Sequence, residues 1–166
     1  VLAWPDRSSH GHVLVQDTAA SAPAYAATAA NGRPAVHFDG VNDFLAGNIG
    51  GITGEVTIVT VCRFDNLVQS TNDFDYLLNL GDDEPLANVS VSRCASGYAP
   101  DWDNRYYARM GSTPGSFKGP ALPGQSWMLL TAVHSATGTT HSLWLNGRNE
   151  AADPYQGPLV LDGKLD

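Results

Sequence analysis

The sequence predicts an all-β protein, an antiparallel β-sandwich made of many short strands. Only 16% of its residues are charged, and it contains 17 Gly and 10 Pro, which is typical of strands joined by tight turns. Segments rich in Val, Ile and Thr recur along the chain, and no window keeps the period of a helix. A length of 166 residues allows a core of its own, so we expect one domain over residues 1–166.

The stretch 34–66 carries the strongest strand and turn signals. Asp39 and Gly40 predict a tight turn, because Gly tolerates positive φ and Asp hydrogen-bonds nearby backbone groups. Apolar and polar residues alternate on both sides of that turn, which predicts a strand before it and a short strand after it. We expect Asp39 and Asp43 to shape the turn by hydrogen bonds to the backbone.

The run 55–64 predicts a long strand, because it is too rich in β-branched residues to be a good helix. Alternation along a strand places two sets of residues on opposite faces. One set is Val56, Ile58, Thr60 and Cys62, and the other is Thr57, Val59, Val61 and Arg63. Since both sets contain apolar residues, we expect this strand in the middle of a sheet stack and not at its edge.

The remaining segments are assigned by the same signals of alternation, β-branched residues and turn residues. We expect strands over 12–16, 76–80, 86–93, 105–110 and 159–161, and a hairpin of 126–135 with 140–146. We expect irregular loops over 19–30, 67–75 and 111–125, the last because it contains three prolines.

Several motifs share an order and spacing that resemble a known family. They are FDGVNDFL (38–45), GEVTIVTVCRFDN (54–66), the Trp-led strand 127–134 and the strand SLWLNG (142–147), which ends in Asn-Gly. This set is similar to the laminin-G-like, or concanavalin A-like, jelly rolls of bacterial secreted proteins. The resemblance covers most of the chain and implies a jelly-roll sandwich in an extracellular or cell-surface protein.

The end of the sequence departs from that family's pattern. Members of the family continue through further strands after the Asn-Gly hairpin, whereas this sequence ends at Asp166. A jelly roll lacking its last strands leaves open sheet edges. We therefore expect that the sequence is a fragment, or that a second chain or domain completes the sandwich.

The net charge of −8 argues against nucleic acid as a partner, because phosphate binding needs clustered Lys and Arg. The nine Lys and Arg residues are scattered along the chain. Apolar runs also stay far below the roughly 20 residues that span a bilayer, so we expect no membrane insertion.

Catalytic motifs of this fold are missing from the sequence, which favours a protein that is not an enzyme. Glucanases of the fold use two Glu flanking an Asp on one strand, and their carboxylates act as acid and nucleophile. None of Glu55, Glu84 and Glu150 is followed two residues later by Asp. Lyases of the fold use Gln-x-His, and no Gln here has a His two residues later.

Two acidic stretches are candidate calcium sites, because Ca²⁺ prefers oxygen ligands. Asp82, Asp83 and Glu84 place three carboxylates in one predicted turn, and residues 101–104 offer a second group. The alternative is a solvated acidic turn in both places. The two cysteines, Cys62 and Cys94, leave two possibilities as well, a disulfide typical of exported proteins or a buried thiol on a central strand.

One cluster combines aromatic, acidic and amide side chains as carbohydrate sites do, since a sugar ring stacks on aromatic rings while polar groups bind its hydroxyls. It comprises Tyr98, Asp101, Trp102, Asp103, Asn104, Arg105, Tyr106 and Tyr107. The alternative is that Trp102 covers the core and that one of the two adjacent tyrosines points inward.

Three functions follow, in order of preference. The first is a non-catalytic carbohydrate-binding module of a secreted or cell-surface protein, with polysaccharide or glycan as ligand and calcium as a possible structural ion. The second is a structural or adhesion domain of an extracellular or viral assembly that binds protein partners. The third is a lyase or hydrolase with an unrecognised site, for example one that uses Arg105, Tyr106 and a His.

Overall fold

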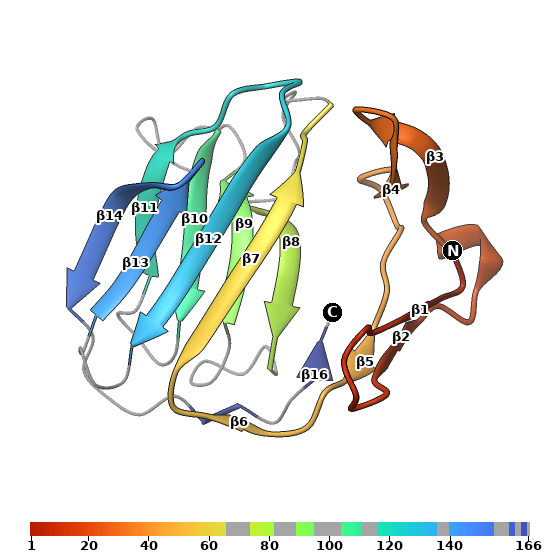
Figure 1. The fold of residues 1–166 in the computed structure, drawn as a ribbon, viewed down its shortest axis with the longest axis horizontal. Helices are drawn as coiled ribbons and strands as arrows, with labels where there is room; N and C mark the ends of the chain where they lie inside the picture. The colour runs from red at the N-terminus through yellow and green to blue at the C-terminus, as the bar shows by residue number, and fades with distance from the viewer. Residues whose placement is uncertain are drawn as a thin grey trace. The chain divides into compact units, whose positions relative to one another are not determined.

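The chain folds into antiparallel β-sheets joined by turns and loops, as seen in a computed structural model (Figure 1). The structure describes residues 1–65, 74–81, 89–94, 104–110, 116–135, 140–154, 160–161 and 164–165. The chain divides into two compact units, the first formed by Val1–Gly50 and Gly163–Asp166 and the second by Gly51–Asp162. Each unit is described by itself.

The first unit contains three small antiparallel ladders. They are β1 (Ala3–Pro5) with β2 (Val13–Val15), β3 (Ala24–Ala30) with β4 (Arg33–His37), and β5 (Gly47–Asn48) with β16 (Lys164–Leu165). A short 3₁₀ turn, η1, covers Ala19–Ser21. The expected loop over 19–30 is wrong for β3, which pairs with β4 across Asn31 and Gly32. Both turn residues have positive φ, 51° and 77°, the conformation that Asn-Gly favours in hairpins.

The turn predicted at Asp39 and Gly40 is confirmed. Gly40 has a φ of 74°, and the Oδ1 atom of Asp39 accepts hydrogen bonds from the backbone N–H groups of Val41, Asn42 and Asp43. The backbone N–H of Asp39 in turn donates to Oδ2 of Asp43 at 2.9 Å. These hydrogen bonds, with that from Val41 the largest contribution, lower the pKa of the Asp39 carboxyl. Both carboxylates therefore shape the turn, as the sequence predicts.

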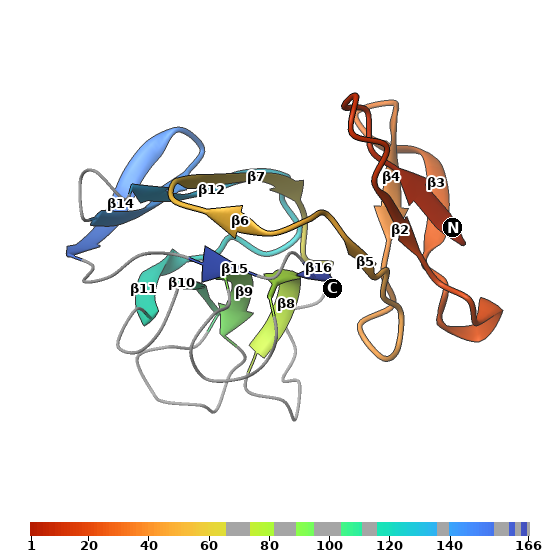
Figure 2. The ribbon, with the colours of Figure 1, turned by 90° about the horizontal axis from the view of Figure 1, so that it is seen from below.

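The second unit is an antiparallel β-sandwich, which confirms the all-β fold class. One sheet has the order β14-β13-β12-β7, and four strands in the order β11-β10-β9-β8 form the facing layer (Figures 1 and 2). The first sheet contains β7 (Val56–Cys62), β12 (Met128–Ser135), β13 (Thr140–Leu145) and β14 (Arg148–Pro154). The second layer contains β8 (Phe74–Leu80), β9 (Val89–Cys94), β10 (Arg105–Met110) and β11 (Ser116–Ala121). The short strands β6 (Ile52–Thr53) and β15 (Val160–Leu161) pair with each other.

The core lies between these two layers. On β12 the buried residues alternate with half-buried or exposed ones, and Leu130 and Ala132 point inward. From the other layer, Tyr106 and Ala108 of β10 are fully buried. Gly119 of β11 lies so close to the other layer that a Cβ atom there would be 3.2 Å from Cδ1 of Leu143 on β13, and 3.1 Å from the Cβ of Tyr106 on the neighbouring strand. The close approach of the layers at this point explains why the position carries no side chain.

The position predicted for the 55–64 strand is wrong in one respect. The two predicted sets of residues do lie on opposite sides of β7: Val56, Ile58 and Thr60 are half-buried and Cys62 is buried, whereas Thr57, Val59 and Val61 are exposed. Among the described strands, however, β7 is the last one of its sheet and pairs only with β12. Val59 and Val61 are 61% and 65% exposed on its outer side. The prediction failed because β-branched residues favour extended backbone whether or not both faces are covered.

The loop expected over 111–125 is also wrong, because Ser116–Ala121 form β11 and pair with β10. Pro120 lies within this strand, and β11 ends the order of its layer. Proline donates no backbone hydrogen bond, so it is tolerated in a strand at the edge of a sheet. The hairpin of β12 and β13 is confirmed, and Asn146 and Gly147 turn the chain into β14 with φ of 52° and 80°.

Cys62 and Cys94 are both buried and are not joined by a disulfide. Burial raises the pKa of the Cys62 thiol to about 11, so this group stays protonated and unreactive at neutral pH. Of the two alternatives that the sequence left open for Cys62, the buried thiol on a strand is the one found in the structure. In the part of the chain that the structure describes, no helix is long and apolar enough to cross a bilayer.

Candidate functional site

The aromatic and acidic cluster predicted from the sequence is only partly described. Tyr98, Asp101, Trp102 and Asp103 lie outside the described residues, as do the predicted calcium ligands Asp82, Asp83 and Glu84. Asn104, Arg105, Tyr106 and Tyr107 are described, and the last three open strand β10. Alternation along the strand places the side chains of Tyr106 and Tyr107 on opposite sides of the layer.

Tyr106 belongs to the core. Its side chain is fully buried and stands beside Gly119, on the side of β10 that faces the other sheet. Burial raises the pKa of its phenol, and the nearby Cys62 adds to the shift. One of the two adjacent tyrosines therefore points inward, which was the alternative that the sequence offered. A tyrosine in this position does not meet a ligand at the surface.

Tyr107 points to the outer side of the same layer and joins two aromatic residues of β8. Its ring lies 4.5 Å from that of Phe74, and Phe74 lies 6.2 Å from Tyr76, measured between ring centroids. Both separations are favourable for aromatic pairs. Exposure rises along this group, because Tyr107 is 9% exposed, Phe74 is half-buried and Tyr76 is 58% exposed. We call Phe74, Tyr76 and Tyr107 the aromatic face.

Polar residues share the outer side of the layer with the aromatic face. Tyr76 and Tyr107 are both register partners of Ser92, and Lys118 is the partner of Tyr107 on β11. The four residues Tyr76, Ser92, Tyr107 and Lys118 therefore form a row across the four strands. The Ser92 hydroxyl donates a hydrogen bond to the backbone carbonyl of Tyr107 at 3.5 Å. Ser92 is fully buried, so the row offers the ring of Tyr76 and, at its other end, the ammonium group of Lys118 on one surface.

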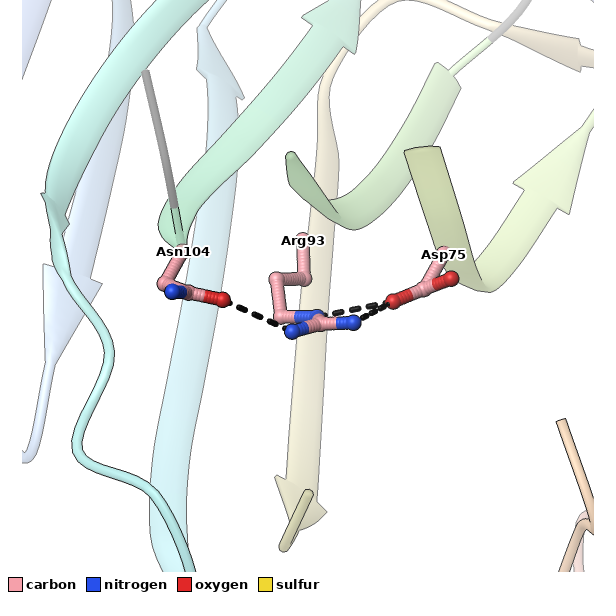
Figure 3. A network of polar contacts seen from close by, with 3 residues as sticks. All are labelled: Asp75, Arg93 and Asn104. Carbon is pink, nitrogen blue, oxygen red and sulfur yellow. Dashed lines mark hydrogen bonds and ion pairs between the residues drawn. The ribbon is translucent and has the colours of Figure 1, made fainter. Parts of the chain in front are cut away.

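Arg93 lies on the opposite side of β9 from Ser92 and is 3% exposed. Figure 3 shows its guanidinium between the side chains of Asp75 and Asn104. Its Nε donates to Oδ2 of Asp75 at 2.8 Å, and its Nη2 forms an ion pair with the same oxygen. Its Nη1 donates to Oδ1 of Asn104 at 2.7 Å, and its guanidinium stacks 5.4 Å above the ring of Phe64. A buried charge needs partners of this kind, so Arg93 is held as a structural cation.

Asn104 has a structural role in this network. Its φ is 55°, a left-handed conformation that Asn adopts more readily than most residues. In this conformation its backbone N–H donates to the carbonyl of Cys94, and its own carbonyl accepts from Leu122. The residue therefore connects β9 to the segment after β11 and presents its amide oxygen to Arg93. Next to it, Arg105 donates from Nη1 to the carbonyl of Gly119 at 3.2 Å.

A second buried polar group lies between β12 and β13. His134 and His141 are register partners, and their Nδ1 atoms are 3.2 Å apart. Both rings are almost completely buried, which lowers both pKa values. The pKa of His141 falls to about 4, with the neighbouring His134 as the second cause. Within the described residues, no group of three or more His, Cys, Asp or Glu side chains is placed to hold a metal ion.

Sequence reasoning missed two of the three members of the aromatic face. Phe74 fell in an expected loop and Tyr76 was assigned only to a strand. The pattern Phe-x-Tyr at 74–76 is the signal that could have found them, because residues two apart on a strand share a face. Their pairing with Tyr107 depends on the order β8-β9-β10, which no local pattern contains.

No protein-family description matches the chain. No curated protein matches it at a significant level either.

Proposed function

We propose that this protein is a non-catalytic carbohydrate-binding module of a secreted or cell-surface protein. Its ligand is a glycan that stacks on the aromatic face. The single observation that supports this proposal most is the ring of Tyr76, which is 58% exposed on a sheet surface next to Phe74 and Tyr107. The resemblance of the sequence motifs to laminin-G-like and concanavalin A-like jelly rolls agrees with it.

The chemistry of the surface suits a sugar. The C–H groups of a pyranose form an apolar face that packs against an aromatic ring, while its hydroxyls need hydrogen-bonding partners at the rim. Tyr76 supplies an exposed ring, and Lys118 lies at the other end of the same row. A rigid sheet carries these groups, so little conformational entropy is lost when a ligand binds.

Glycan-array screening of the purified protein, followed by titration calorimetry with the best ligand, tests the proposal. We expect Tyr76→Ala to weaken binding at least about tenfold, because it removes the exposed stacking surface. Tyr25→Ala is the matched control, since Tyr25 is 65% exposed but belongs to the first unit. Absence of binding to any glycan, or equal losses in the two variants, would contradict the proposal.

A second set of measurements tests the residues whose role in this function is predicted from the sequence alone. Trp102→Ala tests whether the predicted cluster contributes to the same binding, and addition of Ca²⁺ tests the predicted ligands Asp82, Asp83 and Glu84. We expect the Trp102 variant to bind more weakly and calcium to raise the melting temperature. An unchanged melting temperature in Ca²⁺ would remove calcium from the proposal and leave the sugar site to be judged by Tyr76.

One observation favours a second function, a domain that binds protein partners. The outer side of the other sheet exposes Val59, Val61 and Leu129, by 61%, 65% and 37%. Exposed aliphatic side chains that adjoin each other are typical of protein interaction surfaces. A protein that binds no glycan but binds another protein through these residues would support this second function.

A further inference from the structure

Strand β7 lacks the features that protect an exposed sheet edge. Among the described strands it is the last one of its sheet. Its register with β12 runs without a bulge from Val56, opposite His134, to Cys62, opposite Met128. The strand contains no proline, lysine or other charged residue. Proteins normally block such an edge with one of these features, and an unblocked edge can pair with another strand.

The side chains next to this edge are aliphatic. Val59 and Val61 lie on the outer side of β7, and Leu129, the register partner of Val61 on β12, is exposed beside them. Apolar side chains at an unpaired edge favour a partner that supplies both backbone hydrogen bonds and apolar contacts. The edge and the patch therefore point to the same event, the addition of a strand.

The sequence of β7 is complementary to itself. The strand has seven residues with Val59 at its centre, and it is flanked by Glu55 and Arg63. In an antiparallel pair with a second copy, related by a two-fold axis at Val59, residues i and 118 − i are opposite each other. Thr57 then faces Val61, and Glu55 faces Arg63 of the other copy. The charge pair occurs twice, once at each end.

We propose that two copies of this protein pair antiparallel through β7, with the two-fold axis at Val59. The choice of a second copy as the occupant rests on this match of charges, since an acidic residue at one end and a basic residue at the other fit the same strand reversed. Both side chains are exposed and lie outside the seven paired residues. The pairing uses the open edge of each copy, so it closes at a dimer and does not extend into a fibre.

The dimer is weak by this geometry. One strand and the adjoining aliphatic patch bury less than a standard protein interface, so we expect a Kd of about 1–100 μM. Analytical ultracentrifugation of the whole chain over that concentration range measures it. A dimer that forms as concentration rises is expected, and a monomer at all concentrations would overturn the proposal.

A cysteine at the proposed axis tests the register. Val59→Cys places two thiols directly opposite each other, about 4.5–5.5 Å apart at the Cα atoms, which a disulfide can join. Thr57→Cys is the matched control. In the proposed register, position 57 of one copy lies four residues away from position 57 of the other copy, about 13 Å along the strand. Under oxidising conditions we expect a crosslinked dimer from the first variant but not from the second or the unmodified protein. Equal crosslinking of both variants would overturn the register.

A charge exchange tests the ends of the strand. Glu55→Arg and Arg63→Glu each place like charges opposite each other, and we expect each to weaken the dimer about three-fold to tenfold. The double variant Glu55→Arg, Arg63→Glu restores the opposite pairs and should dimerise like the unmodified protein. Both single variants also lose contacts within their own chain, to Ser135 and to Asp65. Failure of the double variant to recover, with circular dichroism unchanged, would overturn the proposed pairing.

Discussion

The two sheets of the sandwich use their outer sides in opposite ways. On β9 every residue is buried, and the outer side carries Ser90 and Ser92. On β7 only one side is covered, and the outer side carries Val59 and Val61 in contact with solvent. On these two strands the buried outer positions, Ser90 and Ser92, are therefore polar and the exposed ones, Val59 and Val61, are aliphatic, which reverses the usual distribution.

This reversal teaches two different things about the two surfaces. Hydroxyls and a guanidinium are tolerated in buried positions only where hydrogen bonds satisfy them, so the β9 region must depend on specific polar partners. Aliphatic side chains cost little at the surface, but a group of them beside an open strand edge favours association. We therefore expect mutations around β9 to change stability and mutations on the outer side of β7 to change assembly.

The largest effect is expected from the partner of the buried arginine. Asp75→Ala leaves the guanidinium of Arg93 without its counterion at 3% exposure, and we expect a loss of about 4 kcal/mol in the free energy of unfolding. Arg93→Met should cost about 1–2 kcal/mol, because the remaining Asp75 side chain is 32% exposed and water can solvate it. Urea denaturation measures both. If Arg93→Met lowered the free energy of unfolding more than Asp75→Ala does, the arginine would contribute mainly by packing on Phe64.

The next largest effect is a loss of stability at low pH, caused by the buried His141 in the other sheet. The pKa of His141 falls from 6.5 to about 4 in the folded state, because burial and His134 disfavour the charged ring. The unfolded state therefore binds protons first, so the contribution to stability is complete above pH 6.5 and is lost as the pH falls towards 4. Linkage gives a loss of about 3 kcal/mol at pH 4. The charge of Glu55 acts on His134 in the opposite direction and limits the loss.

Urea midpoints from pH 8 to pH 4 measure this acid effect, with two variants as the comparison. His141→Gln should flatten the profile below pH 6.5, because it removes the group that takes up the proton. His10→Gln is the matched control, since His10 is exposed in the first unit, and its profile should follow that of the unmodified protein. A slope that His141→Gln leaves unchanged would assign the acid effect to His134 or to carboxylates elsewhere.

Local patterns predicted the strands of the second unit well, because alternation and β-branched runs act over a few residues. Strand β10 occupies 105–110 as predicted, and the Asn-Gly pair at 146–147 ends the predicted hairpin strand. The strand Ala24–Ala30 was missed because its alanines carry little β propensity, although the Asn-Gly pair after it marks a hairpin. Pro120 concealed β11, since proline argues against a strand unless the strand lies at an edge.

The candidate site was less predictable than the fold. Neighbours in sequence, Tyr106 and Tyr107, were grouped together, but they lie on opposite sides of one strand. The true neighbour of Tyr107 is Phe74, which is brought to it by the pairing of three strands. Likewise, the composition of β7 said nothing about its place in the sheet. Strand order is set by long-range pairing, and a single sequence contains no direct signal for it.

The smallest effect is the loss of stability from the same substitution, Val to Ala, made once in each sheet. Val91→Ala on β9 removes methyl groups at a position 1% exposed, and we expect a loss of about 2 kcal/mol in stability. Val59→Ala on β7 makes the same change at 61% exposure and should alter stability by less than about 0.5 kcal/mol. Measured by urea denaturation at low protein concentration, the pair reports burial alone, since the proposed dimer is then dissociated. If Val59→Ala becomes destabilising only as concentration rises, the aliphatic surface contributes to assembly and not to the fold of a single chain.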